Sequence, residues 1–295
     1  MARRKGREAQ GYRPYHGKKR PGRTLPIVLL TLALLAALTL AYAHFIEPRR
    51  LRTETFTVRS ARLTAPLRVA AVADLHIGRD CGPDRVKQVM DAVAALEPDA
   101  VVFLGDLFDD YSKYRAGDEE ELAALLALPA LPDVPKYAVW GNHDLGGGAA
   151  EAFSALLEQA GYTVLRNQSA ALPGNVNLIG ADDLIWGTPD TAALVTEDAF
   201  NLLLCHEPDY ARRTGGVQLQ LSGHTHGLQI NLPLRFYQDW IAPGGGQLYR
   251  AGLYEKEDGG LVYVTRGIGM SLLSLRFNAV PEITLVELRP VGAEQ

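Results

Sequence analysis

Runs of apolar residues that end in polar residues recur along the chain. Residues 67–76, 100–106 and 136–144 each contain a mostly apolar stretch that ends in polar residues. Stretches of this kind are typical of strands that are buried on both faces of a sheet. Residues 53–60 alternate instead, which predicts an edge strand. Shorter apolar runs predict further strands at residues 162–165, 176–181, 200–205, 217–221, 260–265 and 282–288.

Helical spacing appears between the predicted strands. In residues 83–99, Val86, Val89, Met90 and Val93 recur on one side, and Pro98 lies beyond the expected end. Two more helices are predicted at about residues 118–128 and 149–160. Strands that alternate with helices favour an α/β fold of stacked layers.

Residues 24–46 form a different kind of apolar run. These 23 residues contain no Asp, Glu, Lys or Arg. As a helix rising about 1.5 Å per residue they would cross a hydrocarbon core of about 30 Å. We therefore predict a transmembrane helix. A cleaved signal peptide is the alternative, because "AYA" at residues 41–43 has the pattern of a cleavage site, and the chain would then be secreted after Ala43.

Charge is distributed unevenly along the 295 residues, although the composition is that of an ordinary globular protein, with 47% hydrophobic and 22% charged residues. The net charge is −4, but the first 24 residues carry nine Lys and Arg against a single Glu. By the positive-inside rule this arm stays in the cytoplasm, and the domain after the helix lies outside it. The rest of the chain is acidic, so we expect no nucleic-acid binding.

Cysteine is scarce, with Cys81 and Cys205 only. Two cysteines make no disulfide framework. One disulfide in an oxidising compartment is the alternative to two buried free thiols, which we favour.

Chemistry-bearing residues gather at the ends of the predicted strands. In α/β sheets, ligands bind at the carboxyl ends of strands. Five strand ends carry His, Asp or Asn, namely Asp74 and His76, Asp106, Asn142 with His143 and Asp144, His206, and His224 with His226.

The last of these strand ends holds two histidines one residue apart, in "SGHTHG". In an extended chain, side chains at i and i+2 point to the same side, so His224 and His226 can face one point. The nitrogen and oxygen donors, with no thiolate among them, suit Mn, Fe or Zn. Even without His143 and Asp144, the seven remaining residues are too many for one tetrahedral ion, and they suit two ions that share a bridging carboxylate.

Taken in order, D-x-H, G-D, G-N-H-D, an isolated His and G-H-x-H resemble the calcineurin-like metallophosphoesterase superfamily over roughly residues 66–290. The tail "YVTRGIGMSLLSLRFNAVPEITLVEL" is similar to the membrane-associated branch related to YkuE and YaeI. One departure is Leu228, where that branch usually has a second glycine. The resemblance implies a four-layer αββα sandwich behind one transmembrane helix. The expected layout is a basic cytoplasmic arm (1–23), the transmembrane helix or uncleaved signal anchor (24–46), a linker with an edge strand (47–65) and the metallophosphoesterase domain (66–295).

The same resemblance implies roles for the site residues. Asp74, His76 and His226 would hold one divalent ion, and Asn142, His206 and His224 a second. Asp106 would bridge the two. His143 would face the substrate, with Asp144 a candidate for orienting its imidazole. Arg79, Asp109 and Asp110 are interpreted as neighbours of the site without a catalytic role.

The implied reaction is hydrolysis of a phosphomonoester or phosphodiester by a hydroxide that two metal ions activate. His143 would protonate the leaving group or stabilise the phosphoryl charge. One alternative is a membrane-associated pyrophosphatase for a nucleotide-linked glycolipid, like UDP-2,3-diacylglucosamine hydrolase. A second alternative is a catalytically silent, membrane-anchored scaffold. A zinc peptidase is not favoured, because the chain has no H-E-x-x-H.

Aromatic residues follow the "GHTHG" motif. They are interpreted as packing residues of the core and loops, and a lip that faces substrate or lipid is the alternative. These residues are Phe236, Tyr237, Trp240, Tyr249 and Tyr254.

Overall fold

The computed structural model describes Gly11, residues 24–113 and residues 119–292. The predicted basic arm (apart from Gly11), Asp118 at the expected start of a helix, and the last three residues therefore lie outside the described part. The chain divides into two compact units, Met1–Thr39 and Leu40–Gln295. The second unit includes the stretch 47–65 as well as the domain expected from residue 66.

The helix α1 (Thr24–Phe45) is long and apolar enough to cross a membrane, judged by length and composition. It is the one such helix among the described residues. Apolar side chains lie all around it, and those from Thr24 to Leu40 are exposed. A helix that is apolar on every side is typical of a membrane span.

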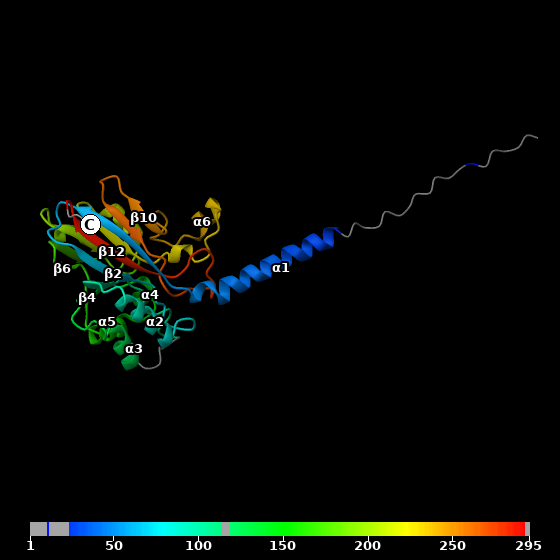
Figure 1. Ribbon diagram of the computed structural model, residues 1–295, viewed down its shortest axis with the longest axis horizontal. Coiled ribbons are helices and arrows are strands. Elements are labelled where there is room, and N and C mark those ends of the chain that lie inside the picture. The colour runs from blue at the N-terminus through cyan, green and yellow to red at the C-terminus, as the bar shows by residue number, and fades with distance from the viewer. Residues whose placement is uncertain (1–10, 12–23, 114–118, 293–295) are drawn as a thin grey trace, which may run out of the picture. The chain divides into compact units, whose positions relative to one another are not determined.

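Two six-stranded sheets form the second unit (Figure 1). The first sheet has the order β1-β12-β2-β3-β4-β5, and it is parallel apart from the antiparallel pair β12 and β2. As predicted, the strand at residues 53–60 lies at an edge. The bounds are β1 (Arg52–Ser60), β12 (Glu282–Pro290), β2 (Leu67–Val72), β3 (Ala100–Phe103), β4 (Lys136–Ala138) and β5 (Tyr162–Val164).

The second sheet has the order β10-β11-β9-β8-β7-β6. Its four inner strands are parallel, and an antiparallel strand closes each edge. The two edge strands, β6 and β10, were not predicted, because each is short and leaves much of its surface exposed. The bounds are β10 (Gly252–Glu255), β11 (Leu261–Val264), β9 (Leu219–Ser222), β8 (Phe200–Leu204), β7 (Val176–Gly180) and β6 (Gln168–Leu172).

Alternate residues of the inner strands face different cores. Val69 and Ala71 of β2 pack between the sheets against Leu202 of β8. Ala70 and Val72 face the other way, toward the predicted helix face that carries Val86, Val89, Met90 and Val93. Three helices cover the first sheet on this side, α2 (Pro83–Ala94), α3 (Glu119–Leu126) and α5 (Ala150–Gln159).

Short 3-10 helices cover the outer face of the second sheet. Tyr210 of η3 packs there with Ile179 and Leu203. The connecting segments are short and are broken by residues such as Pro208, and a long α-helix would need a longer uninterrupted run. Helices, two sheets and this outer cover make the predicted four-layer sandwich. The cover contains η2 (Ala192–Leu194) and η3 (Pro208–Arg213).

The remaining short helices lie around the carboxyl ends of the strands. They are η1 (Glu47–Arg49), α4 (Asn142–Gly146), η4 (His226–Leu228) and α6 (Arg235–Ile241). The packing interpretation of the aromatic residues is wrong for Phe236 and Trp240, which are exposed on α6. It holds for Tyr249 and Tyr254, whose rings pack together next to the buried Val262.

Candidate metal centre

The loops that carry the predicted site residues turn sharply where their strands end. Asp74, His76, Asp106, His224 and His226 have φ values of 54°, 44°, 56°, 73° and 52°. This left-handed region is uncommon for residues other than glycine. The turns bring the five side chains back over the ends of the two sheets. Backbone strain of this kind is concentrated at functional sites.

Two glycines of the motifs stand where no side chain would fit. A methyl group on Gly141 would overlap the carboxylate of Asp106, and one on Gly223 would overlap the carboxylate of Asp74. Both carboxylates therefore rest directly against a neighbouring backbone. Leu228, where the sequence departs from the expected glycine, also has a left-handed backbone, with φ 68°.

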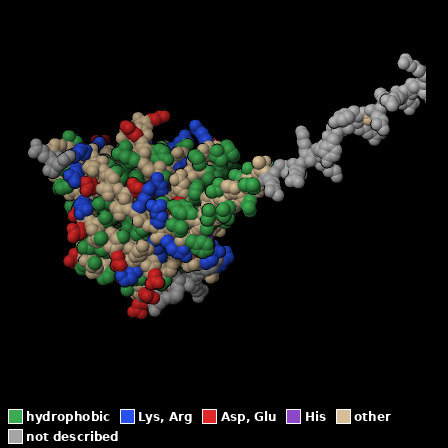
Figure 2. Space-filling view, turned by 45° about the vertical axis from the view of Figure 1, so that its right-hand side comes forward, with side chains coloured by type: hydrophobic (Ala, Val, Ile, Leu, Met, Phe, Trp, Pro, Cys, Tyr) green, Lys and Arg blue, Asp and Glu red, His purple; other side chains and the backbone are tan. Residues whose placement is uncertain are grey.

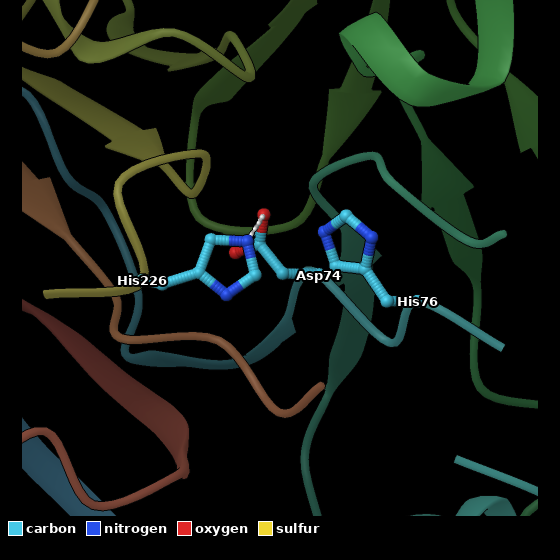
Figure 3. Close-up of side chains that lie close together, drawn as sticks. All are labelled: Asp74, His76 and His226. Atoms are coloured by element: carbon cyan, nitrogen blue, oxygen red, sulfur yellow. Dashed lines mark ion pairs between the residues drawn. The ribbon is translucent and has the colours of Figure 1, made fainter. Parts of the chain in front are cut away.

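One group of site residues contains Asp74, His76 and His226 (Figure 3). One donor atom from each lies within 4.8 Å of the others, and all three residues are buried. Nε2 of His226 is 3.8 Å from Oδ1 of Asp74, and the two imidazole rings are 4.8 Å apart between centroids. These are the three residues expected to share one ion.

A second group contains Asp106, His206 and His224, also buried. Asn142 joins it, with Oδ1 2.8 Å from Nδ1 of His224. Oδ2 of Asp106 lies 3.1 Å from Nε2 of His206 and 3.4 Å from Nε2 of His76. A single carboxylate thus touches both groups.

Backbone carbonyls fix the ring tautomers. Nδ1 of His206 donates to the carbonyl of Leu104 at 2.7 Å, and Nε2 of His224 donates to the carbonyl of Gly244 at 2.8 Å. A carbonyl oxygen can only accept, so these nitrogens carry the hydrogens. In the neutral rings, Nε2 of His206 and Nδ1 of His224 then point lone pairs into the cluster, as metal-binding histidines do.

Several buried atoms of the cluster have no hydrogen-bond partner in the described part of the chain. They are Oδ2 of Asp74, both ring nitrogens of His76 and Nε2 of His206. Buried polar atoms in folded proteins are almost always paired. Nδ1 of His224 and Oδ1 of Asn142 also face each other as two acceptors. The donor set therefore fits divalent cations.

Electrostatics divide the four histidines into two pairs. Burial works to lower the pKa of His76, but the nearby carboxylates of Asp106 and Asp109 raise it to about 9. Burial also works to lower the pKa of His206, but the negative charge of Asp106 outweighs it and holds this pKa well above its usual value. Burial and the charge of His206 lower the pKa of His224 to about 4. Burial and the charge of His76 hold the pKa of His226 well below its usual value.

His143 lies at the start of α4, half-buried beside the cluster. Its Nδ1 donates to the carbonyl of Asp109 at 2.6 Å, and its ring meets that of His76 edge-on. Asp144 was the candidate for orienting this imidazole, and that expectation is corrected. The oxygens of Asp144 accept backbone N–H bonds from Asp106, Leu107 and Gly141, so Asp144 ties two loops together. Burial and the charge of Asp106 raise the pKa of Asp144 to about 7.

Asp109 and Arg276, which were not predicted to take part in the site, contact its histidines. Oδ1 of Asp109 lies 3.4 Å from Nδ1 of His76, and its carbonyl holds His143. Arg276 is completely buried, with Nη2 3.3 Å from Nδ1 of His226. No motif marks Arg276, and the available signal was a lone arginine within an apolar stretch.

The cluster opens into two adjoining pockets. The first, of about 430 Å³, has walls that are polar and apolar in equal parts, and its charged or polar lining includes His76, Arg79, Asp109 and Asp110. The second, of about 400 Å³, has Asp106, His224 and His226 at one end. Asn142, His143, Ser271, Leu272 and Leu273 line both. The remaining wall of the second pocket is largely apolar, with Leu228, Ile230, Tyr237, Ile241 and Pro243.

Known proteins share this chain's sequence pattern. The family described as calcineurin-like phosphoesterase matches residues 67–228, which contain all nine predicted site residues. The uncharacterized metallophosphoesterase YkuE of Bacillus subtilis is 35% identical, over 87% of this chain and 92% of its own length. The phosphodiesterase YaeI of Escherichia coli is 31% identical, over 84% and 92%. The UDP-2,3-diacylglucosamine pyrophosphatase LpxG of Chlamydia trachomatis is 24% identical, over 88% and 95%.

The family match covers more than half of the chain, and the similarity to YkuE extends over nearly all of both proteins. The family is metal-dependent, in agreement with the unpaired donor atoms of the cluster. The chain therefore belongs to the calcineurin-like phosphoesterase family and is a phosphoester hydrolase.

Proposed function

We propose that this hydrolase cleaves phosphomonoesters or phosphodiesters with two divalent cations. Asp74, His76 and His226 would hold one, and Asn142, His206 and His224 the other. The observation that carries the proposal is the position of Asp106, whose carboxylate contacts a histidine of each group. The donors favour Mn, Fe or Zn.

Two such cations would offset the negative charge of the phosphoryl group and make a nucleophile from water near neutral pH. The side chains of the protein then position the reaction. Because Nδ1 of His143 donates to the carbonyl of Asp109, Nε2 is left for the substrate. When protonated, Nε2 can give a proton to the leaving oxygen or donate a hydrogen bond to a phosphoryl oxygen.

Two variants test this division of roles. Asp106→Ala removes the shared carboxylate, so it should lose both ions and nearly all turnover. Asp106→Asn preserves shape and should behave similarly if the carboxylate charge is needed. Asp91→Ala, on the exposed face of α2, is the matched control. Metal content by mass spectrometry and turnover of an aryl ester give the two readings.

His143→Ala should retain two ions per chain and lose about 10²–10⁴ in rate on an alkyl ester, where the leaving alkoxide needs a proton. The loss should be small on a nitrophenyl ester. Loss of metal from His143→Ala would contradict the ligand assignment. An equal loss of rate on both esters would make His143 a stabiliser of phosphoryl charge and not an acid.

A lipid-linked pyrophosphate is the second candidate substrate. The apolar wall of the second pocket favours it, because a phosphate held at the cluster would leave room there for a hydrocarbon chain. The similarity to LpxG, a pyrophosphatase of UDP-2,3-diacylglucosamine by name, points the same way. Turnover of matched pyrophosphates with and without an acyl chain separates the two candidates.

We also propose that α1 anchors the chain with the hydrolase outside the cytoplasm. The length and apolar composition of α1 support the anchor, and the excess of basic residues before it supports the orientation. A reporter enzyme fused after Gln295 should be active only outside the cytoplasm. Activity inside the cytoplasm would overturn the orientation.

A further inference from the structure

An exposed apolar rim borders the second pocket. It consists of Phe236 and Trp240 on α6 and Leu272 and Leu273 in the loop between β11 and β12. Their exposed fractions are 75%, 81%, 94% and 54%. Phe236 and Trp240 are four residues apart on a helix and so share one face. Large apolar groups that cluster in contact with water mark interaction sites with proteins or membranes.

The loop with Leu272 and Leu273 lies against the end of α1. From Leu40 onward, the chain belongs to the same compact unit as the loop. The carbonyl of Ala43 accepts a hydrogen bond from the backbone N–H of Arg276 at 2.9 Å. Nδ1 of His44 lies 2.7 Å from the carbonyl oxygen of Ser274. The loop is thus fixed to the last residues of the apolar run.

Basic side chains flank the same region. Arg49 and Arg50 follow α1 and are exposed, and Arg235 is exposed at the start of α6. Arg79 hydrogen-bonds Ser274 in the loop itself. In Figure 2, hydrophobic and basic side chains adjoin on the visible surface. Exposed apolar side chains can enter the interface of a bilayer, and nearby arginines are attracted to its anionic lipids.

We propose that the apolar rim rests in the interfacial layer of the membrane that anchors this chain. The proposal rests on the proposed anchor role of α1. If Ala43 and His44 lie where the chain leaves the bilayer, the loop they contact is held at the bilayer surface. Leu272 and Leu273 also line both pockets, so the mouth of the metal centre faces the lipid headgroups. Amphiphilic phosphoesters could then reach the centre without leaving the membrane.

Tryptophan fluorescence tests the docking without relying on activity. The full chain is reconstituted into vesicles of phosphatidylcholine and phosphatidylglycerol with brominated acyl chains, which quench indoles inside the bilayer. The chain has three tryptophans, and Trp186 is also exposed (66%) but lies on the wall of the first pocket and not on α6. Trp240→Phe should abolish most of the quenching, and the matched control Trp186→Phe should leave it intact. Equal quenching in the two variants would overturn the proposal.

A second pair of variants tests the loop. Leu272→Asp with Leu273→Asp should reduce the quenching of Trp240 toward the level of Trp240→Phe, because the carboxylates resist entry into the interface. Leu253→Asp, an exposed leucine on β10, is the control and should change nothing. An unchanged signal in the double variant would remove the loop from the contact.

Flotation of the vesicles separates the two proposals. If the full chain does not float with the vesicles, the anchor fails and the docking fails with it. If it floats but Trp240 is not quenched, the docking alone is wrong. Absent quenching together with concentration-dependent dimers in detergent would assign the rim to a second copy of this chain.

Discussion

Arg276 connects to Ala43 by a backbone hydrogen bond of 2.9 Å. At its other end, its guanidinium lies 3.3 Å from the ring of His226 and donates to the carbonyls of Gly269 and Ala279. One buried residue therefore contacts both the end of α1 and the candidate metal centre. Burial lowers the pKa of Arg276 to about 10, so it remains charged near neutral pH and disfavours a second positive charge on His226.

Arg276→Lys should weaken the metal centre. Lysine keeps the charge but cannot reach both carbonyls with a planar fork. A buried carbonyl left unpaired lowers the free energy of unfolding by about 1–3 kcal/mol. Loss of a residue that supports a metal ligand typically reduces metal affinity or activity about 10–100-fold. Metal titration and urea unfolding measure the two effects. Arg289→Lys, in a surface pair with Glu287, is the control. Wild-type metal affinity in Arg276→Lys would contradict this role.

Chelation should lower the melting temperature of the wild-type protein. Cations that bind only the folded chain stabilise it, by about 4 kcal/mol when their concentration is 1,000 times the dissociation constant. Calorimetry of the chelated protein, followed by single additions of Mn, Fe or Zn, measures the recovery. Asp106→Ala should show no shift on chelation. A chelator shift of wild-type size in that variant would place the stabilising ion elsewhere.

A chain that starts at Glu47 should be less stable than a chain that starts at Leu40. The shorter chain loses the carbonyl of Ala43, which accepts from the backbone N–H of Arg276, and the contact of His44 with Ser274. An unpaired buried N–H costs about 1–3 kcal/mol. Both chains should fold and hydrolyse a soluble aryl ester, with the shorter one less stable in urea. Equal stability would show that residues 40–46 add nothing to the fold.

Both cysteine thiols should be unreactive in the folded protein. Cys81 and Cys205 are free and buried, as favoured from the sequence. Burial raises the pKa of Cys81 to about 12, and that of Cys205 well above its usual value. Because the thiolate is the reactive form, a disulfide reagent at pH 8 should label neither thiol. In guanidinium it should label two per chain. Fast native labelling would show that the loop around Cys81 opens.

The sequence predicted the central strands because their residues are mostly apolar. In residues 67–72 every residue except Arg68 is apolar and buried, as expected for a strand that is covered on both faces. The edge strands β6 and β10 carry no such signal. "GNHD" was expected to follow a strand directly, but Asn142 begins the helix α4. A helix of five residues is too short to show a helical periodicity in the sequence.

The sequence predicted which residues converge at the candidate centre, but it did not predict the residues that surround them. Residues from five strand ends do converge, because parallel strands end at one edge of a sheet. The contacts of Asp109 and Arg276 arise from loops and a buried guanidinium with no fixed spacing from the motifs. Residue roles at such positions depend on tertiary contacts, which composition and spacing do not encode.

The left-handed turns at Asp74, His76, Asp106, His224 and His226 affect how the protein acquires its metal. Each strained residue costs about 1–3 kcal/mol. Together they are comparable to the net stability of a whole domain, which is about 5–15 kcal/mol. Cations bound by these side chains would offset the strain, so metal uptake would add to the stability of the folded chain. The chain would then carry whichever divalent metal is abundant in the compartment where it folds. The compartment in which the chain folds, as well as its donor atoms, would decide the identity of that metal.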